Sequence, residues 1–374
     1  MKVPLHEIHE SMGAKYTLFA GYQLPLYYTS ITNEHLSVRN NVGIFDVSHM
    51  GRILVEGEDV QEYLNYVLAN DINNLYVGRM HYSLILNENA GIIDDITVFM
   101  LDEYRFLLVV NAINRLKVVN WLNRHKVGYA INIKDVTRNS IMLAVQGPRS
   151  SQVYREIYNK DFDIKRFHFI ESGVLGEEKS SVISRSGYTG EDGFEIIYFF
   201  CDKGDAFSIW RKIYGKVEKL GGLACGLGAR DMLRIEAGYV LYDNDIDEDI
   251  NPYEASLDWV VKLNKPNFIG KKTLISSKYK IWKKRYGLVM IEPGIPRRGY
   301  KIYKEESVVG YVTSGGYSPI LKKGIGMVYI DIRKINEPEN REVNIDIRGK
   351  LRKAVIKKFP LYDIKKYGYG RIIR

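Results

Sequence analysis

The hydrophobic pattern of this 374-residue chain changes near residue 270, and the change limits the folds that the chain can adopt. Before it, apolar residues recur at helical spacing in two segments, and strand-like runs occur between and around them. The helical segments are 114–124 and 205–220, and the strand-like runs include 105–110, 140–145 and 194–200. Because these segments show no regular strand–helix–strand alternation, we predict an α+β fold for residues 1–275.

The remaining residues, 276–374, have the pattern of a small all-β domain. Short β-like segments separated by turns lie at 286–291, 308–313, 326–332 and 341–347. This arrangement is typical of a small β-barrel or jelly-roll-like domain. We therefore place a domain boundary near residue 275.

Most of the net charge lies at the C-terminal end of the chain. The chain has 54 Lys and Arg against 45 Asp and Glu, a net charge of +9. Nine basic residues and a single acid, Asp363, lie within 350–374, which accounts for +8 of that charge. A near-neutral body is atypical of a nucleic-acid-binding domain, so we expect no nucleic-acid partner. The basic tail remains suited to an acidic partner or ligand.

Features of the N-terminus and the cysteines predict a cytoplasmic protein. Residues 1–13 contain acids where an export signal would have its apolar core, and no window approaches the roughly 18 apolar residues of a membrane span. Cys201 and Cys225 provide neither a disulfide framework nor a cysteine-based zinc site. We expect no membrane partner and no bound metal.

Two familiar catalytic and cofactor motifs are incomplete in this sequence. Asp46, Ser48 and His49 are the residue types of a hydrolytic triad, but close neighbours in an extended segment cannot converge on one substrate. Residues 226–231 begin like a dinucleotide-binding fingerprint, but Asp231 replaces its third glycine and no βαβ unit surrounds it. These features argue against a serine hydrolase and against a Rossmann site.

Residues 243–254 resemble a calcium-binding loop only in the spacing of their carboxylates. The spacing is that of Asp243, Asp245, Asp247 and Glu254. Glu248 stands where such a loop needs glycine, and Pro252 interrupts the expected exit helix. We therefore expect a polar loop that lines a site or an interface.

Two segments deliver carboxylates into apolar strands. Asp94 and Asp95 follow a glycine-led turn and precede the apolar run 96–99, so one of the two should face inward. Glu195 follows the glycine-rich loop 187–193 and precedes another apolar run. A buried carboxylate is costly unless it has partners, and such groups often mark functional sites. Carboxylates bonded only to loop amides remain the structural alternative.

Taken together, these segments resemble the aminomethyltransferase, or T protein, family of the glycine cleavage system. The resemblance runs nearly from end to end. It rests on FAGYQLP at 19–25, GIFDVSHM at 43–50, GIIDD at 91–95, LAVQGP at 143–148, GYTGEDGFE at 187–195, ARDMLRIEAG at 229–238, LYDNDIDE at 241–248 and VTSGGYSP at 312–319.

The resemblance implies a fold and a reaction. The fold is three domains around a central folate pocket, with two interleaved α+β domains in 1–275 and the β-barrel in 276–374. The reaction takes an aminomethyl group from the dihydrolipoyl arm of H protein, releases ammonia and gives 5,10-methylenetetrahydrofolate. Tetrahydrofolate and the lipoylated H protein are then the acceptor substrate and the partner, and no metal is required.

The same resemblance assigns roles to individual residues. Asp95 is the catalytic candidate, and Asp94 should face the other side of the strand and bond locally. Glu195 matches the pterin-binding carboxylate, and its two oxygens suit the paired N–H edge of the pyrimidine. Arg230 suits a pterin oxygen or the folate glutamate. Further candidates for the pocket are Tyr82, Asn111, Tyr188, Trp259 and a late tyrosine, Tyr367.

Other functions of this fold stay open at this point. A folate-dependent demethylase would share the pocket, and a non-catalytic folate-binding module would keep Glu195 and Arg230 without needing Asp95. The branch that assists iron–sulfur cluster assembly is disfavoured, because residues 236–245 lack its cysteine. The basic tail either steers docking of H protein, which is typically acidic in this family, or forms solvated lysines on an edge strand.

Overall fold

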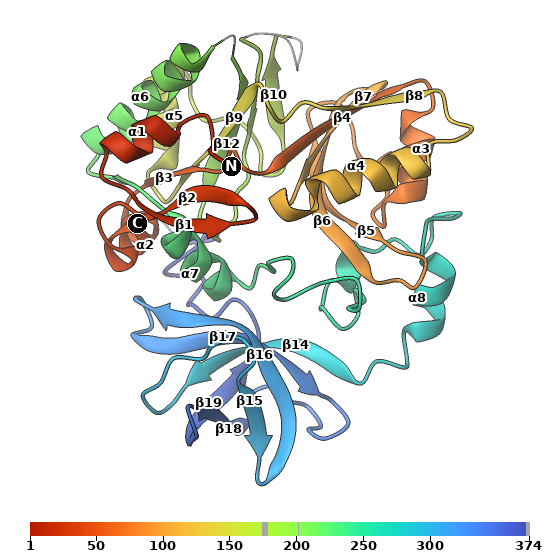
Figure 1. The fold of residues 1–374 in the computed structure, drawn as a ribbon, viewed down its shortest axis with the longest axis vertical. Coiled ribbons are helices and arrows are strands. Elements are labelled where there is room, and N and C mark those ends of the chain that lie inside the picture. The colour runs from red at the N-terminus through yellow and green to blue at the C-terminus, as the bar shows by residue number, and fades with distance from the viewer. Residues whose placement is uncertain (174–178, 201, 372–374) are drawn as a thin grey trace.

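A computed structural model describes residues 1–173, 179–200 and 202–371. The chain forms two sheet-containing lobes and a β-barrel, with α7 (Leu227–Ala237) located where the three meet (Figure 1). The α+β fold class predicted from the sequence is confirmed. Within the described ranges, no helix has both the length and the apolar character needed to cross a membrane.

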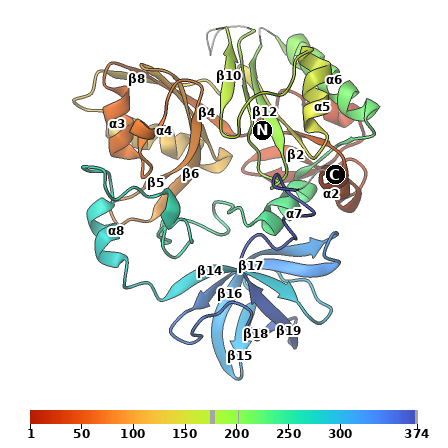
Figure 2. The same ribbon diagram turned by 180° about the vertical axis from the view of Figure 1, so that it is seen from behind.

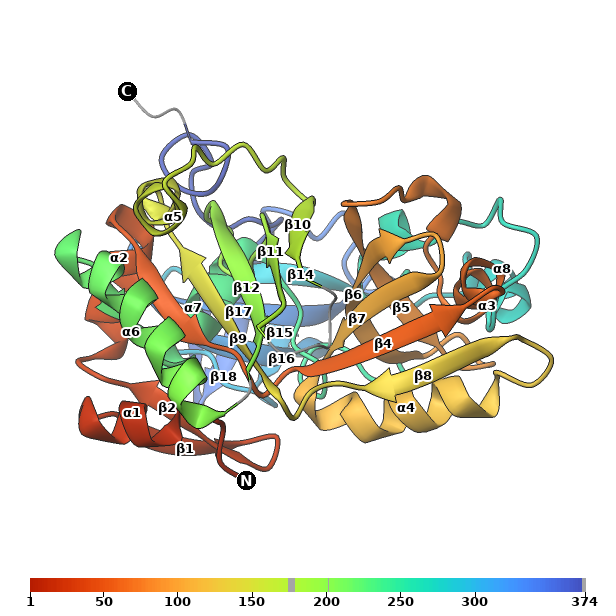
Figure 3. The same cartoon turned by 90° about the horizontal axis from the view of Figure 1, so that it is seen from above.

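The first lobe is built on a six-stranded sheet. Its strand order is β10-β11-β12-β9-β3-β13, with bounds Phe169–Ser172, Ser181–Ser184, Gly193–Phe199, Ser140–Gln146, Gly43–Asp46 and Leu223–Ala224. Its helices are α1 (His6–Ser11), α2 (Ile31–Asn40), α5 (Ser150–Tyr158) and α6 (Lys203–Lys219), and a hairpin of β1 (Lys15–Phe19) and β2 (Tyr22–Tyr27) lies beside them. Figure 3 shows α5 and α6 along one side of this sheet, where Trp210 and Val153 belong to a common apolar core.

The second lobe is inserted between two strands of the first. After β3 the chain builds a five-stranded sheet in the order β5-β6-β7-β4-β8, and it returns to the first sheet through β9. The strands are β4 (Gly51–Gly57), β5 (Met80–Leu86), β6 (Ile92–Asp102), β7 (Arg105–Val110) and β8 (Ile131–Asp135), and the helices are α3 (Val60–Val67), η1 (Ile72–Asn74), η2 (Ala112–Asn114) and α4 (Arg115–Arg124). This interleaving brings β6 and β12 to the same central region.

The C-terminal unit is a closed six-stranded barrel, as the sequence predicts. The order β14-β17-β16-β15-β18-β19 comprises Lys283–Met290, Lys323–Asp331, Ser307–Ser318, Lys301–Lys304, Glu342–Ile347 and Lys350–Lys357. η3 (Asp258–Val260) and α8 (Lys271–Ser277) precede it, so the boundary predicted near residue 275 falls inside α8. The edge-strand interpretation of 350–358 is wrong, because β19 pairs with β14 on one side and with β18 on the other.

The segment after the barrel returns to the first lobe. Figure 2 shows it rising from the barrel beside α7 toward α2. The backbone N–H of Leu361 donates to the Glu236 carbonyl, and that of Tyr369 donates to the Gly190 carbonyl. The segment that carries the basic tail therefore makes contacts within the protein. Its last residues, 372–374, lie outside the described ranges.

Candidate active site

A cavity of about 960 Å³ lies where the two lobes and the barrel meet. Its walls come from β6, from β12 and the loop before it, from α7 and the segment that follows α7, and from Arg285 of the barrel. Among the residues predicted from the sequence, Asp95, Glu195, Arg230, Tyr82, Asn111, Tyr188 and Trp259 all line this cavity. The fold therefore gathers side chains that are up to 177 positions apart in the sequence.

The two adjacent carboxylates of β6 have separate environments. Asp95 lines the cavity, and its Oδ2 accepts from the Tyr82 hydroxyl at 3.0 Å while its Oδ1 accepts from Asn111 Nδ2 at 2.8 Å. Asp94 is fully buried and accepts from the side-chain amides of Asn111 and Asn114, each at 2.8 Å. Strand alternation thus puts Asp95, and not Asp94, on the cavity side.

Burial sets the protonation behaviour of both carboxyl groups. It raises the pKa of Asp95, and hydrogen bonds from Tyr82 and Asn111 offset part of that rise. Burial also raises the pKa of Asp94, and the neighbouring charge of Asp95 adds to the effect. A carboxylate with a raised pKa beside a cavity is suited to accepting a proton near neutral pH.

Tyr82 and Trp259 form an aromatic wall next to Asp95. Their rings are stacked, with centroids 5.9 Å apart and planes 18° from parallel. Trp259, in η3, is 61% exposed, whereas burial and Asp95 raise the pKa of Tyr82 well above its ordinary value. Tyr82 therefore stays protonated and donates its hydroxyl hydrogen to Asp95.

Glu195 reaches the cavity from the start of β12. Its Oε2 accepts from the Ser186 hydroxyl at 2.5 Å, and burial raises its pKa while Ser186 and Arg230 lower it in part. The preceding loop is tight: a Cβ on Gly187 would lie 1.9 Å from Gln146 Oε1, and Gly190 has φ +80°. Glycine at these two positions lets the loop turn closely against β9 and present Glu195.

Arg230 projects from α7 into the same part of the cavity. Its guanidinium carbon lies 4.7 Å from the centre of the Tyr188 ring, and its Nη1 has no hydrogen-bond partner. Burial lowers its pKa, and the charge of Glu195 offsets part of that effect. Tyr188 is held in turn by its hydroxyl, which donates to the Val240 carbonyl. Arg230 is thus a half-buried cation whose buried Nη1 has hydrogen-bonding capacity that the protein leaves unused.

The most buried carboxylate of the loop at 243–254 is that of Asp245, and its role is structural. Asp245 accepts from Arg234, from the Thr313 hydroxyl at 2.5 Å and from the Ser314 hydroxyl at 2.7 Å, which joins α7 to β16 of the barrel. Asp243 lines the cavity. In the part of the chain that the structure covers, no group of three or more His, Cys, Asp or Glu side chains could hold a metal ion. The polar-loop interpretation of this segment agrees with these contacts.

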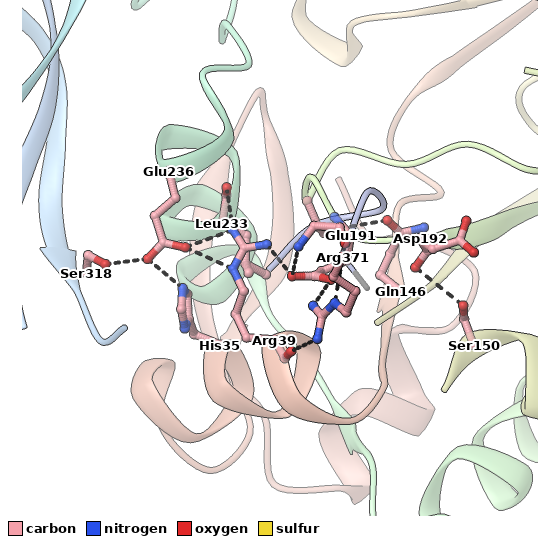
Figure 4. A network of polar contacts seen from close by, with 12 residues as sticks. His35, Arg39, Gln146, Ser150, Glu191, Asp192, Leu233, Glu236, Ser318 and Arg371 are labelled. Carbon is pink, nitrogen blue, oxygen red and sulfur yellow. Dashed lines mark hydrogen bonds and ion pairs between the residues drawn. The ribbon is translucent and has the colours of Figure 1, made fainter. Parts of the chain in front are cut away.

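A buried network of charges lies beside the glycine-rich loop, and we call it the paired cluster (Figure 4). Arg39 contacts Glu191 and Glu236, each at 2.8 Å. Glu236 also accepts from His35 at 2.9 Å and from the Ser318 hydroxyl at 2.5 Å, and Arg371 of the C-terminal segment contacts Glu191. The cluster therefore joins α2, α7, the barrel and the C-terminal segment beside the cavity, and its Glu191 is also a lining residue.

Tyr367 is the one predicted pocket residue that the structure does not bring to the cavity. Its ring lies 6.5 Å from that of Tyr362, whereas Tyr369 lines the cavity. Tyr369 is placed by its bond to Gly190 and by the Arg166 guanidinium, which lies 3.3 Å from its ring centre. The sequence offers three tyrosines in an irregular tail, Tyr362, Tyr367 and Tyr369, and no periodicity by which to choose among them.

Sequence reasoning also missed Arg166 and His49 as lining residues. Arg166 lies in a segment without a motif, so nothing in the sequence pointed to it. His49 lies in the motif at 43–50, where it was considered only as a member of a hydrolytic triad. Asp46 and Ser48 do bond to each other at 2.5 Å, but no hydrogen bond joins either of them to His49.

Comparisons with known proteins agree along nearly the whole chain. Residues 5–265 match the GCVT N-terminal domain, and residues 283–363 match the glycine cleavage T-protein C-terminal barrel domain. An aminomethyltransferase of Aquifex aeolicus is 42% identical over 96% of this chain and 95% of its own length. One from Pseudothermotoga lettingae is 41% identical, covering 96% of this chain and 98% of the relative.

A solved structure gives the same result in three dimensions. The glycine cleavage system aminomethyltransferase T of Bartonella henselae superposes with a TM-score of 0.90 at 34% identity, over 99% of each chain. The resemblance inferred from the sequence motifs is thereby confirmed. Since one family model spans more than half of the chain and relatives match nearly all of it, the chain belongs to the glycine cleavage T-protein family.

Proposed function

We propose that the chain is the tetrahydrofolate-dependent aminomethyltransferase of the glycine cleavage system. The observation that carries the proposal is the position of Asp95. Its carboxylate lines the same cavity as Glu195 and Arg230 and is held by Tyr82 and Asn111. A binding module would need Glu195 and Arg230 but would gain nothing from a half-buried carboxylate with a raised pKa at Asp95.

The reaction moves one carbon from sulfur and nitrogen to two folate nitrogens. The carbon of the S–CH₂–NH₂ group loses its bonds to sulfur and to the amine, and it gains bonds to N5 and N10 of tetrahydrofolate. The two N–H hydrogens of folate leave as protons, one of which completes ammonia and the other the dihydrolipoyl thiol. Catalysis therefore needs a group that accepts and returns protons and that stabilises cationic character on the transferred carbon.

Asp95 meets both requirements. As a carboxylate it accepts a proton from a folate amine, and its negative charge stabilises an iminium-like carbon during transfer. Tyr82 and Asn111 fix the orientation of the carboxylate, so little reorganisation is needed at the moment of reaction. Burial raises the pKa of Asp95 toward the range in which a proton can be both taken and returned.

Glu195 and Arg230 bind and orient the folate. Glu195 accepts from the paired N–H groups of the aminopyrimidine edge, a charge-assisted contact. Arg230 donates to a folate oxygen through the N–H groups that the protein leaves unpaired. Tyr188 and the Tyr82–Trp259 pair supply flat apolar surfaces beside them.

The remaining parts of the proposal concern partners and location. The aminomethyl donor is the lipoylated H protein, whose arm must reach the cavity from outside. Tetrahydrofolate is the acceptor substrate, and each step described above is assigned to a side chain of the protein. The cytoplasmic location expected from the sequence stays a prediction.

A single assay tests the proposed function. Aminomethylated H protein and tetrahydrofolate are incubated with and without the chain, and methylenetetrahydrofolate and ammonia are measured. We expect both products in equal amounts, and only with the chain present. Folate binding without either product would favour a non-catalytic module. Product formation from a methylated amine, with none from aminomethylated H protein, would favour a demethylase.

A further inference from the structure

The loop that joins the two lobes is built around His49. Asp46 Oδ1 accepts from the backbone N–H of Ser48 at 2.9 Å, on the N-terminal side of His49. Arg52 Nη1 donates to the Ser48 carbonyl at 2.8 Å and also to the carbonyl of Met50. Both charged side chains are buried, and each contacts the backbone that flanks His49 in addition to partners elsewhere in the fold. The position of this residue is therefore fixed before any ligand binds.

Aromatic rings from the β1–β2 hairpin fix the imidazole itself. The Phe19 ring lies edge-on to it, with centroids 5.8 Å apart and planes at 88°, and the Tyr22 ring lies 6.4 Å away. His49 is 2% exposed and nevertheless lines the cavity, together with Phe19. These aromatic contacts thus fix the orientation of the imidazole, and one side of the ring faces the cavity.

The two ring nitrogens of His49 are left without partners. Neither forms a hydrogen bond within the described residues, and Nδ1 is also sealed from solvent. Nε2 is not sealed, so it is the nitrogen that reaches the cavity. Burial lowers the pKa of His49 to about 3; the charges of Arg230 and Arg52 act in the same direction, and that of Asp46 opposes them. The ring is therefore neutral near pH 7 and carries one hydrogen.

The environment also indicates which nitrogen carries that hydrogen. A buried N–H without a partner is rarer, and costs more, than a buried acceptor without one. The hydrogen therefore belongs on Nε2, where a ligand in the cavity can accept it. Arg230, whose charge acts on His49, is a second donor with an unpaired N–H in the same region.

We propose that His49 is a specificity-determining residue whose Nε2–H donates to an oxygen of the bound folate, beside Arg230. This inference rests on the proposed function, because it takes folate as the ligand. The acceptor is either the 4-oxo group of the pterin or a carboxylate of the glutamate tail. Both groups are oxygen acceptors, and ligand analogues that lack one or the other distinguish between them.

The test measures equilibrium binding of three ligands to the wild-type chain and to His49→Phe. The ligands are tetrahydrofolate, its 4-amino-4-deoxy analogue, which replaces the pterin oxygen with a donor, and tetrahydropteroate, which lacks the glutamate. We expect His49→Phe to weaken tetrahydrofolate binding about 10-fold, the scale for an unpaired buried acceptor. Binding of the one analogue that lacks the contacted oxygen should not weaken, and this identifies the oxygen.

Two further variants separate a direct contact from a structural effect. His49→Gln keeps a neutral N–H donor and should recover part of the affinity. His6→Phe is the matched control, because His6 is another buried histidine with an unpartnered Nδ1 but does not line the cavity. It should leave the binding of all three ligands unchanged. An equal loss for all three ligands in His49→Phe, or no loss for any, would overturn the proposal.

A measurement on the wild-type chain covers the case in which the variants fail to fold. With ¹⁵N-labelled histidine, the His49 Nε2–H resonance should shift when tetrahydrofolate is added, and the ring should stay neutral. An unchanged resonance at saturating folate would overturn the His49 contact alone. Failure of the wild-type chain to bind tetrahydrofolate would instead overturn the proposed function.

Discussion

The paired cluster and the cavity both contain charged and polar groups away from solvent, but these groups differ in the hydrogen-bond partners that the protein gives them. In the paired cluster, Arg39 bonds two glutamates at 2.8 Å, and Glu236 has further donors in His35 and Ser318. In the cavity, Arg230 and His49 keep nitrogens without any partner. The charged groups of the paired cluster pair with one another, although His35 Nδ1 in the cluster also lacks a partner, whereas the unpartnered nitrogens of Arg230 and His49 belong to residues that line the cavity.

This difference separates groups that hold the fold from groups that await a ligand. Leaving a buried polar group unpaired costs about 1–3 kcal/mol. Such atoms also occur away from the cavity, at His6 for example, so the mark of a group that awaits a ligand is an unpartnered nitrogen on a residue that lines the cavity. Substitutions in the paired cluster should therefore affect stability, and substitutions in the cavity should affect binding and turnover. The predictions below test that division, beginning with the largest effect.

Arg39→Met should be the most destabilising of these changes. It removes the cation but leaves Glu191 and Glu236 buried, and breaking a buried pair in this way costs about 3–5 kcal/mol. Urea denaturation should show that loss in the free energy of unfolding. Arg155→Met is the matched control, because its partner Asp161 is exposed, and such pairs contribute at most about 1 kcal/mol. Losses of similar size in the two variants would contradict the claim that the buried pairs of the paired cluster hold the fold.

Asp95→Asn should lower turnover by about 10² to 10³ and leave tetrahydrofolate binding nearly intact. The amide keeps the shape but removes the charge on which stabilisation of the transition state depends. Turnover and folate titration are measured on the same preparation. Asp94→Asn should act mainly on stability, because Asp94 does not line the cavity and bonds to Asn111 and Asn114. Rate loss in Asp94→Asn alone would reverse the assignment within the pair.

The acid side of the pH profile provides a separate check on Asp95. Its pKa is raised, so the active carboxylate is present above that raised value and is lost as the pH falls through it. The low-pH limb of kcat/KM should then have a midpoint above about 4, the ordinary value for aspartate. A limb at or below the ordinary value would show that a carboxylate with a raised pKa does not control the reaction.

Glu195→Ala should weaken folate binding by about 1–3 kcal/mol with a smaller effect on stability. The pyrimidine N–H groups would lose their acceptor in a buried site. Folate titration and thermal melting followed by circular dichroism test this together. Unchanged affinity with a lowered Tm would mean that Glu195 serves only to hold Ser186, with which it bonds at 2.5 Å.

The sequence could predict those features that depend on local periodicity. Alternation along β6 placed Asp95 and Asp94 on opposite faces, and the turn-rich pattern of residues 276–374 predicted a barrel. It could not predict that β3 pairs with β9, nearly 100 residues later, because the insertion of a whole lobe leaves no local signal. Tyr369 was missed for a similar reason: its place depends on a backbone bond to Gly190 and on a stacked Arg166.

The smallest expected effect concerns Lys357 and Lys358 of the basic tail, which belong neither to the paired cluster nor to the cavity lining. Lys357 Nζ donates to Asn340, and Lys358 pairs with Glu339 at 2.5 Å, but both contacts are at the surface and leave the tail positive. Exposed charges mainly raise association rates, and salt screens them over about 10 Å at 0.1 M. Reversing both lysines to glutamate should raise the apparent KM for H protein a few-fold at low salt, with little effect at high salt or on folate affinity. Lys301→Glu with Lys304→Glu, on β15, is the matched control for net charge. An equal rise in KM in both double variants would assign the effect to overall charge, and a rise that persists at high salt would assign the tail lysines to the fold.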